Sequence, residues 1–100
     1  MKPYLADNRL SLDAKGMMSL VCNFQTKQSV GNTYLTDKAL SLRAKGLLAI
    51  LLDISNEEVS ASILKKYCSD SIRDVVKGLN ELESLNYVTL ANSKIRVLGA

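Results

Sequence analysis

Two stretches of the chain repeat the same order of apolar and polar positions. Residues 4–21 and 34–51 align at an offset of 30, and nine of the 18 positions are identical. The identical pairs are Tyr4/Tyr34, Leu5/Leu35, Asp7/Asp37, Leu10/Leu40, Ser11/Ser41, Leu12/Leu42, Ala14/Ala44, Lys15/Lys45 and Gly16/Gly46. Chance explains so long a match poorly, and the match indicates a duplicated structural unit.

Each copy predicts one helix. Ser11 and Ser41 stand directly before apolar-rich segments, and a serine hydroxyl there can accept a backbone N–H that the first helical turn leaves unpaired. We expect helices over about residues 12–24 and 42–54. The polar segment Gln25–Thr33 reads as the connector between them.

A lysine and a glycine recur near the start of both helices, as Lys15-Gly16 and Lys45-Gly46. Glycine in a helix costs about 1 kcal/mol relative to alanine. Its repetition favours a structural reason, the close approach of another backbone, over a merely tolerated glycine. The lysines could contact a phosphate, but we expect their alkyl chains to cover apolar surface while the ammonium groups stay in water.

The second helix is apolar on nearly every side, which is not the pattern of a one-sided surface helix. It must therefore be covered on more than one face. The first helix is the obvious cover, in the same chain or in a second copy of it. The residues expected at this packing or dimerisation surface are Met17, Met18, Phe24, Leu47, Leu48 and Leu51.

The second half predicts a short helix, a turn and a longer helix. After the polar loop 55–58, Val59 can add a short strand, and a helix begins at Ser60 or Ser62 and ends near Tyr67. Ser71 is placed to cap the longer helix, which ends near Asn86. The residues expected inside are Ile63, Leu64, Tyr67, Ile72, Val75, Val76, Leu79, Leu82 and Leu85. The exposed positions are Arg73, Asp74, Lys77, Asn80, Glu81 and Ser84.

The last segment alternates as a β-hairpin does, with Asn92-Ser93 at the turn. We expect Val88 and Leu90 on one face, Ile95 and Val97 on another, and Lys94 and Arg96 directed outward. Helix, short helix, turn, longer helix and hairpin is the order of a winged helix-turn-helix. The predicted fold is mainly α: a winged helix-turn-helix over residues 31–100 with a small C-terminal hairpin, preceded by a helical repeat over residues 1–30.

Composition excludes most chemistry. The chain has 100 residues, no histidine and two distant cysteines, so histidine-based metal sites and Ser-His-Asp or Cys-His catalysis are excluded. There is also no glycine-rich phosphate loop. We expect no enzymatic activity, no metal, no cofactor and no small-molecule substrate.

Charge and hydropathy limit the classes of partner that the protein can bind. The net charge of +3 and the pI of about 9.0 are compatible with nucleic acid. The longest apolar run, Gly46–Leu52, is too short to cross a bilayer, and Met1–Tyr4 lacks the apolar core of a signal peptide. We expect a cytoplasmic protein with no membrane partner.

The stretch Leu40–Leu48, Leu-Ser-Leu-Arg-Ala-Lys-Gly-Leu-Leu, resembles the first helix of a winged-helix family. Members of that family belong to phages, plasmids and conjugative elements of Gram-positive bacteria. Ser69–Val76 is similar to the family's turn and recognition-helix start, and Leu79–Val88 to its ending. The resemblance covers residues 34–90 and implies DNA binding in replication initiation or transcriptional regulation.

The chain departs from the family pattern in three places. Asn86 stands where the family usually has glycine, and the segment 53–56 after the first helix lacks the usual proline. The first-helix motif also occurs again at residues 4–21, with no complete winged domain behind it.

The resemblance and the order of elements assign the DNA contacts. Arg73, Lys77 and Asn80 are expected at base edges, since they lie on the predicted recognition helix. The expected phosphate contacts are Lys65, Lys66, Lys94 and Arg96. Few such contacts come from one chain, so we expect a homodimer on a quasi-palindromic double-stranded site.

Two alternatives to DNA binding stay open. Residues 60–100 carry six basic and four acidic side chains, a net charge of only +2, and Asp74 and Glu81 would repel phosphate. The outer side of the longer helix can therefore be an ordinary solvated face with ion pairs. The winged helix can also lack affinity for DNA, either as a protein-interaction or dimerisation module or as an inert regulatory or antirepressor-like partner.

Overall fold

A computed structural model describes residues 3–26, 33–54, 59–91 and 94–98, and the side chains of these except residues 23–26 and 33. The fold is mainly helical and ends in a small antiparallel sheet, as the sequence predicts at this level. In chain order the elements are α1 (Pro3–Ala6), α2 (Leu12–Thr26), the 3₁₀ helix η1 (Thr33–Thr36), α3 (Leu42–Asp53), α4 (Ala61–Lys65), α5 (Ile72–Ser84), β1 (Val88–Ala91) and β2 (Lys94–Val97).

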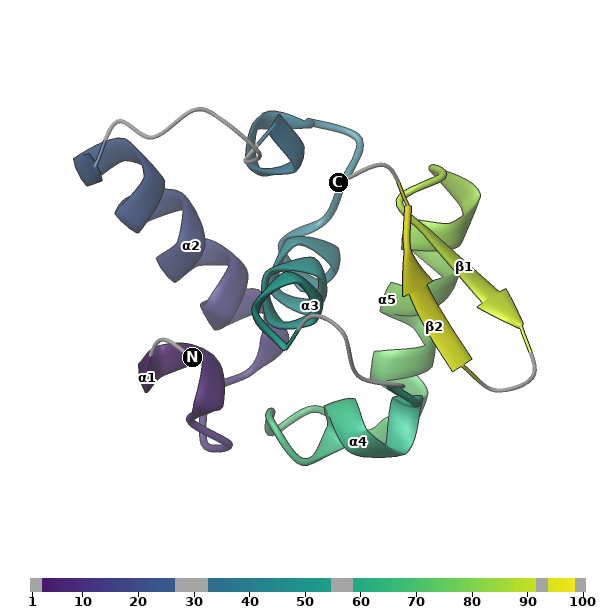
Figure 1. Cartoon of the computed structure of the whole chain (residues 1–100). Coiled ribbons are helices and arrows are strands. Elements are labelled where there is room, and N and C mark those ends of the chain that lie inside the picture. The colour runs from purple at the N-terminus through teal and green to yellow at the C-terminus, as the bar shows by residue number, and fades with distance from the viewer. Residues whose placement is uncertain (1–2, 27–32, 55–58, 92–93, 99–100) are drawn as a thin grey trace.

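Helix α3 is the centre of the molecule. Figure 1 shows α2 on one side of α3, with α5 and the hairpin on the other and α4 near one end. Every residue from Ala44 to Leu51 is buried, so α3 is covered on all sides, as its apolar sequence requires. The cover on the first side is α2 of the same chain.

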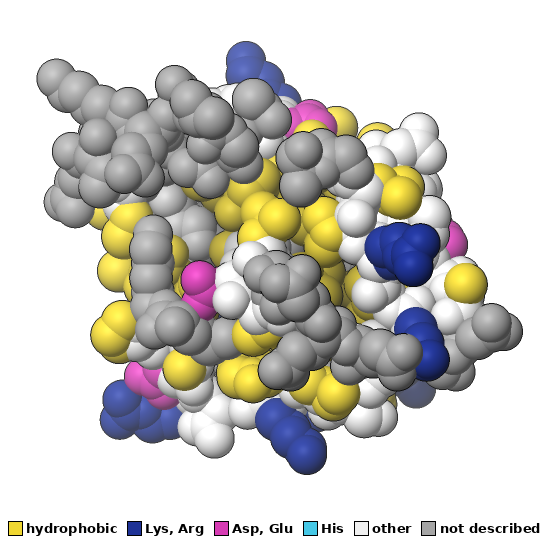
Figure 2. All heavy atoms as spheres, viewed as in Figure 1, with side chains coloured by type: hydrophobic (Ala, Val, Ile, Leu, Met, Phe, Trp, Pro, Cys, Tyr) yellow, Lys and Arg dark blue, Asp and Glu magenta, His cyan; other side chains and the backbone are white. Residues whose placement is uncertain are grey.

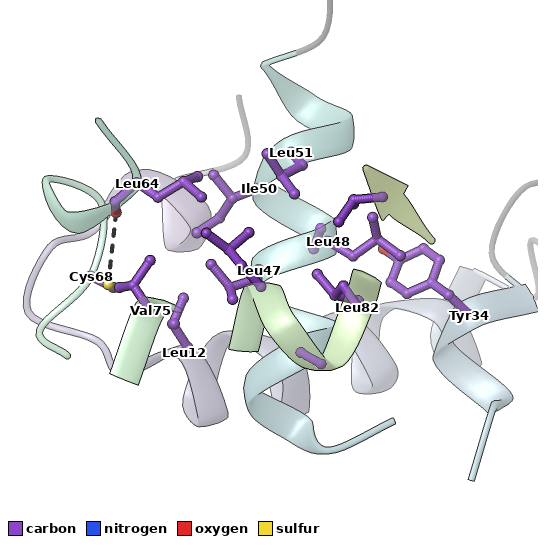
Figure 3. Close-up of a cluster of buried hydrophobic side chains, with 14 of the residues drawn as sticks. Leu12, Tyr34, Leu47, Leu48, Ile50, Leu51, Leu64, Cys68, Val75 and Leu82 are labelled. Carbon is purple, nitrogen blue, oxygen red and sulfur yellow. Dashed lines mark hydrogen bonds between the residues drawn. The ribbon is translucent and has the colours of Figure 1, made fainter. Parts of the chain in front are cut away.

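The buried side chains form one cluster around α3 (Figure 3). Leu47 and Ile50 are 0% exposed, and they meet Leu64 of α4, Val75 of α5 and Leu12 of α2 in that cluster. The two halves of the chain therefore share a single hydrophobic core.

Helices α2 and α3 approach each other at the two repeated glycines. A Cβ built on Gly16 would overlap the carbonyl oxygen of Leu42 and lie 3.2 Å from the amide nitrogen of Gly46. A Cβ built on Gly46 would overlap the carbonyl oxygen of Leu12 and lie 3.1 Å from the amide nitrogen of Gly16. The prediction of a close backbone approach is confirmed. The contact is reciprocal, because equivalent residues exchange the same contacts, which is the mark of a two-fold relation.

The entry to each repeat helix has the same local structure. The hydroxyl of Ser11 accepts from Ala14 N, and that of Ser41 accepts from Ala44 N, both at 3.1 Å. Both serines therefore act as predicted. The preceding turns also match, since Asp7 and Asp37 each accept a backbone N–H from two residues further on at 2.9 Å.

The environment of Lys15 differs from the sequence-based expectation. Its side chain is 0% exposed, and Nζ donates a 2.6 Å hydrogen bond to the carbonyl oxygen of Leu5. Burial lowers the pKa of this ammonium. The expectation of a solvated ammonium is wrong at Lys15, because the backbone of α1 folds over it. Lys45 is also buried, at 8% exposure.

The C-terminal sheet is joined to the rest of the chain at two points. Asn86 has a positive φ of 66° between α5 and β1, as its predicted left-handed role requires. Val59 forms an isolated antiparallel bridge with Ile95, whose N donates a 2.9 Å hydrogen bond to the Val59 carbonyl. The expected extra strand at Val59 is therefore present as this single bridge.

The strand register corrects the predicted faces of the hairpin. Val88 pairs with Val97 and Leu90 with Ile95. Paired residues of an antiparallel ladder lie on the same side of a sheet, so all four apolar side chains share one face. The expectation of two separate faces is wrong, and the single face packs on the core.

Helix α5 buries a narrower stripe than its apolar spacing suggests. Val75, Leu79 and Leu82 are buried as predicted. Ile72, Val76 and Leu85 are 46%, 40% and 37% exposed, and Ile63 of α4 is 36% exposed. These four expectations of burial are wrong. On α5 the buried residues Val75, Leu79 and Leu82 form one side of the helix, and the elements that contact it, α3, α4 and β1, leave the three outer apolar residues exposed.

Several predicted features lie outside the described residues. They are most of the connector 25–33, the loop 55–58, the turn Asn92-Ser93 and the side chain of Phe24. None of the helices in the described ranges is both long and apolar enough to cross a membrane.

Candidate nucleic-acid interface

The outer side of α5 presents the three residues that the sequence assigns to base contacts. Arg73, Lys77 and Asn80 are all exposed. They follow one another at spacings of four and three, so they lie on one face of the helix. Within the described part of the chain, neither Arg73 nor Lys77 forms an ion pair with a carboxylate. The ion pairs that the alternative of a solvated face assigned to these two residues are therefore absent from the described part of the chain.

Glu81 does not face outward as the sequence suggests. Its carboxylate accepts hydrogen bonds from Ser41 N at 2.6 Å and from the Ser41 hydroxyl at 2.8 Å. It is thus held at the N-terminus of α3, where the helix dipole favours a negative charge. The expected repulsion of phosphate by Glu81 is weakened, because this carboxylate is turned toward α3.

Asp70 has the corresponding role at α2. Its carboxylate accepts a 2.6 Å hydrogen bond from Leu12 N, and the neighbouring Ser69 N donates to the carbonyl oxygen of Leu10 at 3.0 Å. The turn before α5 is therefore fixed to the start of α2. Two carboxylates of the second half thus stabilise the N-termini of the two repeat helices.

The start of α5 is fixed by its own cap. Ser71 has extended backbone angles, and its hydroxyl accepts from Asp74 N at 3.2 Å. The predicted cap at Ser71 is confirmed. Asp74 is half-buried and remains the acidic residue nearest the outer face of α5.

The four residues assigned to phosphates come from α4 and β2. Lys66 is exposed and Lys65 half-buried at the end of α4. Lys94 and Arg96 are exposed, on the face of the hairpin opposite to the apolar one. Figure 1 shows α4 and the hairpin at different sides of α5, so the two elements that carry these cations flank α5.

Figure 2 shows that the lysine and arginine side chains on this face of the molecule are separated from one another. Lysine and arginine side chains stand mostly at the rim of this face, with apolar side chains toward its middle. The face seen there is therefore not a continuous cationic patch.

Arg43 is a residue that the sequence analysis did not single out. A Cβ on Gly78 of α5 would lie 3.3 Å from Cγ of Arg43, so the arginine stem packs directly on α5. Its Nε is buried without a hydrogen-bond partner among the described residues. The repeat could have drawn attention to Arg43, because the equivalent residue of the first copy is Asp13, which has the opposite charge.

The residues assigned to packing or dimerisation divide into two groups. Leu47, Leu48 and Leu51 are 0%, 2% and 4% exposed inside the chain's own core, so they pack but offer no surface to a partner. Met17 and Met18 are 51% and 40% exposed on α2. Val21, on the same helix, extends this apolar row at 41% exposure.

Cys68, which lies in the turn before α5, is a poor candidate for a reactive thiol. Cys68 is 2% exposed, its Sγ donates to the Leu64 carbonyl at 3.7 Å, and burial raises its pKa. A raised pKa disfavours the nucleophilic thiolate. The described residues contain no group of three histidine, cysteine or acidic side chains that could hold a metal ion.

Comparisons with protein-family models, with curated proteins and with solved structures find no match to this chain.

Proposed function

We propose that the protein binds double-stranded DNA as a winged helix-turn-helix. In this proposal α4 and α5 are the helix-turn-helix, and β1 and β2 are the wing. The observation that carries the proposal is the outer face of α5, where Arg73, Lys77 and Asn80 are exposed and neither cation forms an ion pair with any described residue. The bridge between Val59 and Ile95 supports the winged-helix assignment, since it joins the segment before α4 to the hairpin after α5.

In the proposed complex α5 enters the major groove. Arg73 and Lys77 donate to guanine O6 and N7 or to phosphates, and Asn80 can bond an adenine edge through both its donor and its acceptor. Lys65, Lys66, Lys94 and Arg96 contact phosphates on either side, which sets the position on the duplex without reading sequence. No enzymatic step is part of this function.

The resemblance of residues 34–90 supplies the cellular context. It supports a role in replication initiation or transcriptional regulation of a mobile element. A selection of bound duplexes from a random pool tests this part, because an initiator or regulator enriches a defined site. An unenriched pool contradicts it.

Binding itself is tested with the double variant Arg73→Ala/Lys77→Ala. We expect it to lose at least about tenfold in duplex affinity at 50 mM salt, because charge-assisted contacts contribute about 1–3 kcal/mol each. Wild-type affinity should also fall steeply between about 50 and 200 mM salt, since neutralised phosphates release counterions.

The matched control is Arg9→Ala/Lys38→Ala. It also removes two positive charges, from exposed positions in the loops before α2 and α3, where Arg9 forms an ion pair with Asp7. Equal losses in the two double variants would show that only net charge matters, and would contradict the assignment of α5.

A second candidate function is self-association through α2. The exposed row of Met17, Met18 and Val21 favours it, because contiguous apolar surface of this kind marks contact sites. Sedimentation of wild type and of Met17→Ser/Val21→Ser measures it. A homodimer that the variant dissociates, with little change between low and high salt, supports this function. A wild-type monomer at all concentrations contradicts it.

A further inference from the structure

Two aliphatic side chains lie exposed on the proposed DNA-reading helix. Ile72 and Val76 are 46% and 40% exposed on α5, four residues apart in the first two turns. They are neighbours on the helix surface and lie directly beside Arg73 and Lys77. The rest of the exposed surface of α5 is polar apart from Leu85 at its C-terminal cap. An apolar pair at this place fits a ligand that offers an apolar group within an otherwise polar surface.

Double-stranded DNA offers one such counterpart. The C5-methyl group of thymine is the apolar feature of the major-groove edge, and aliphatic side chains contact it in protein–DNA complexes. We propose that Ile72 and Val76 pack against thymine methyl groups, so that α5 prefers sites containing A·T pairs. The inference rests on the proposed DNA binding and adds the base class that the same face selects.

The neighbouring residues favour this ligand over an apolar protein surface. Arg73 and Lys77 have no carboxylate partner in the described part of the chain, and docking a purely apolar surface here would desolvate two unpaired cations. In a major groove, phosphates lie on either side of the thymine methyl groups, so Arg73 and Lys77 would also find anionic partners there. Asn80, one turn beyond Val76, can bond to the adenine that pairs with a contacted thymine.

The experiment removes the methyl groups from the DNA. The probes are two hairpin-closed duplexes of alternating dA-dT and alternating dA-dU, which keep the same Watson–Crick edges and differ only at C5. At 50 mM salt we expect the wild type to bind the dA-dU duplex about tenfold more weakly, on the basis of about 0.8 kcal/mol for each buried methyl-sized group. Equal binding of both duplexes overturns the inference but leaves DNA binding intact. Binding to neither duplex, nor to a random-sequence duplex, removes the proposed function itself.

Two variants locate the effect on the protein. Ile72→Ala/Val76→Ala should reduce the preference for dA-dT over dA-dU from about tenfold to about twofold or less, while its affinity for the dA-dU duplex stays near that of the wild type. Arg96→Ala, a proposed phosphate contact, should weaken both duplexes equally. Circular dichroism checks that each variant is folded. A thymine preference that survives in the Ile72/Val76 variant overturns the assignment to these two residues.

Discussion

Helices α2 and α3 share one repeated sequence pattern, but their outer sides differ in exposure to solvent. Met17, Met18 and Val21 of α2 are 40–51% exposed, while their equivalents Leu47, Leu48 and Leu51 are at most 4% exposed. The caps, the preceding turns and the glycine contact are nevertheless the same in both. The repeat therefore determines local structure and the α2–α3 contact, while the second half of the chain decides which copy is buried.

The side of each helix that meets the other copy has kept identical residues, such as Leu12/Leu42 and Gly16/Gly46. On the opposite side, the copy that the C-terminal half does not cover has methionine and valine where the other copy has leucine. Four sets of substitutions can break or sharpen this comparison.

The glycine contact should give the largest effect. Gly16→Ala and Gly46→Ala should each destabilise the fold by about 4 kcal/mol or more, because the new methyl overlaps a backbone carbonyl that cannot rotate away. Urea unfolding measures it. The control is Gly78→Ala, whose Cβ meets the movable end of the Leu47 side chain and Arg43. A smaller loss for Gly16→Ala than for Gly78→Ala would contradict the reciprocal contact.

The next largest difference should be between substitutions on the outer faces of α3 and α2. Leu47→Ala should cost about 2–4 kcal/mol, because the residue is 0% exposed in the core. The matched variant Met17→Ala, at the equivalent position with 51% exposure, should cost less than about 1 kcal/mol. Equal losses in thermal or urea unfolding would mean that α2 is covered on its outer side as α3 is.

The two caps should differ by a smaller amount. Ser11→Ala should cost about 1 kcal/mol through the lost cap. Ser41→Ala should cost more, since its hydroxyl also donates a 2.8 Å hydrogen bond to Glu81. Adding Glu81→Gln to each serine variant gives the coupling: it should appear with Ser41 and be absent with Ser11. Identical coupling in both cycles would contradict the contact between Glu81 and Ser41.

Lys15 should make the stability of the fold depend on pH. Burial lowers the pKa of Lys15 from 10.5. Between the lowered value and 10.5 the unfolded chain binds more protons than the native one, so the free energy of unfolding rises with pH in that window. Lys15→Met should remove this rise and change stability at pH 7 little, whereas Lys45→Met should retain it. A rise that persists in Lys15→Met would assign it to another group.

The features predicted from sequence are those encoded within a few residues. Ser41 and Ser71 act as caps because the bond closes over three positions, and the glycines were recognisable because the repeat displays each of them twice. The expectations that were wrong at Lys15 and Glu81 depend on partners outside the local pattern. The burial of Lys15 comes from the backbone of α1, and Glu81 meets Ser41 across 40 positions of sequence. No local pattern carries that information.

The outer face of α5 shows a different limit. Its three-and-four spacing is correct for a helix, yet Ile72 and Val76 stay exposed because the covering elements touch one side only. Periodicity shows which side of a helix is apolar, but not how wide the neighbouring surface is. The exposed apolar residues of the candidate site therefore become visible only in the folded chain.

The hydrogen bond from Leu12 N to Asp70 spans 58 positions and has a mechanical consequence. It connects the start of α2 to the turn that precedes α5. The orientation of α5 therefore depends partly on α2, a helix that need not contact a ligand. Unfolding of the first turn of α2 would break this bond and allow the turn and α5 to change orientation. Conversely, a ligand that locks α5 would slow amide hydrogen exchange at the beginning of α2, on the far side of α3.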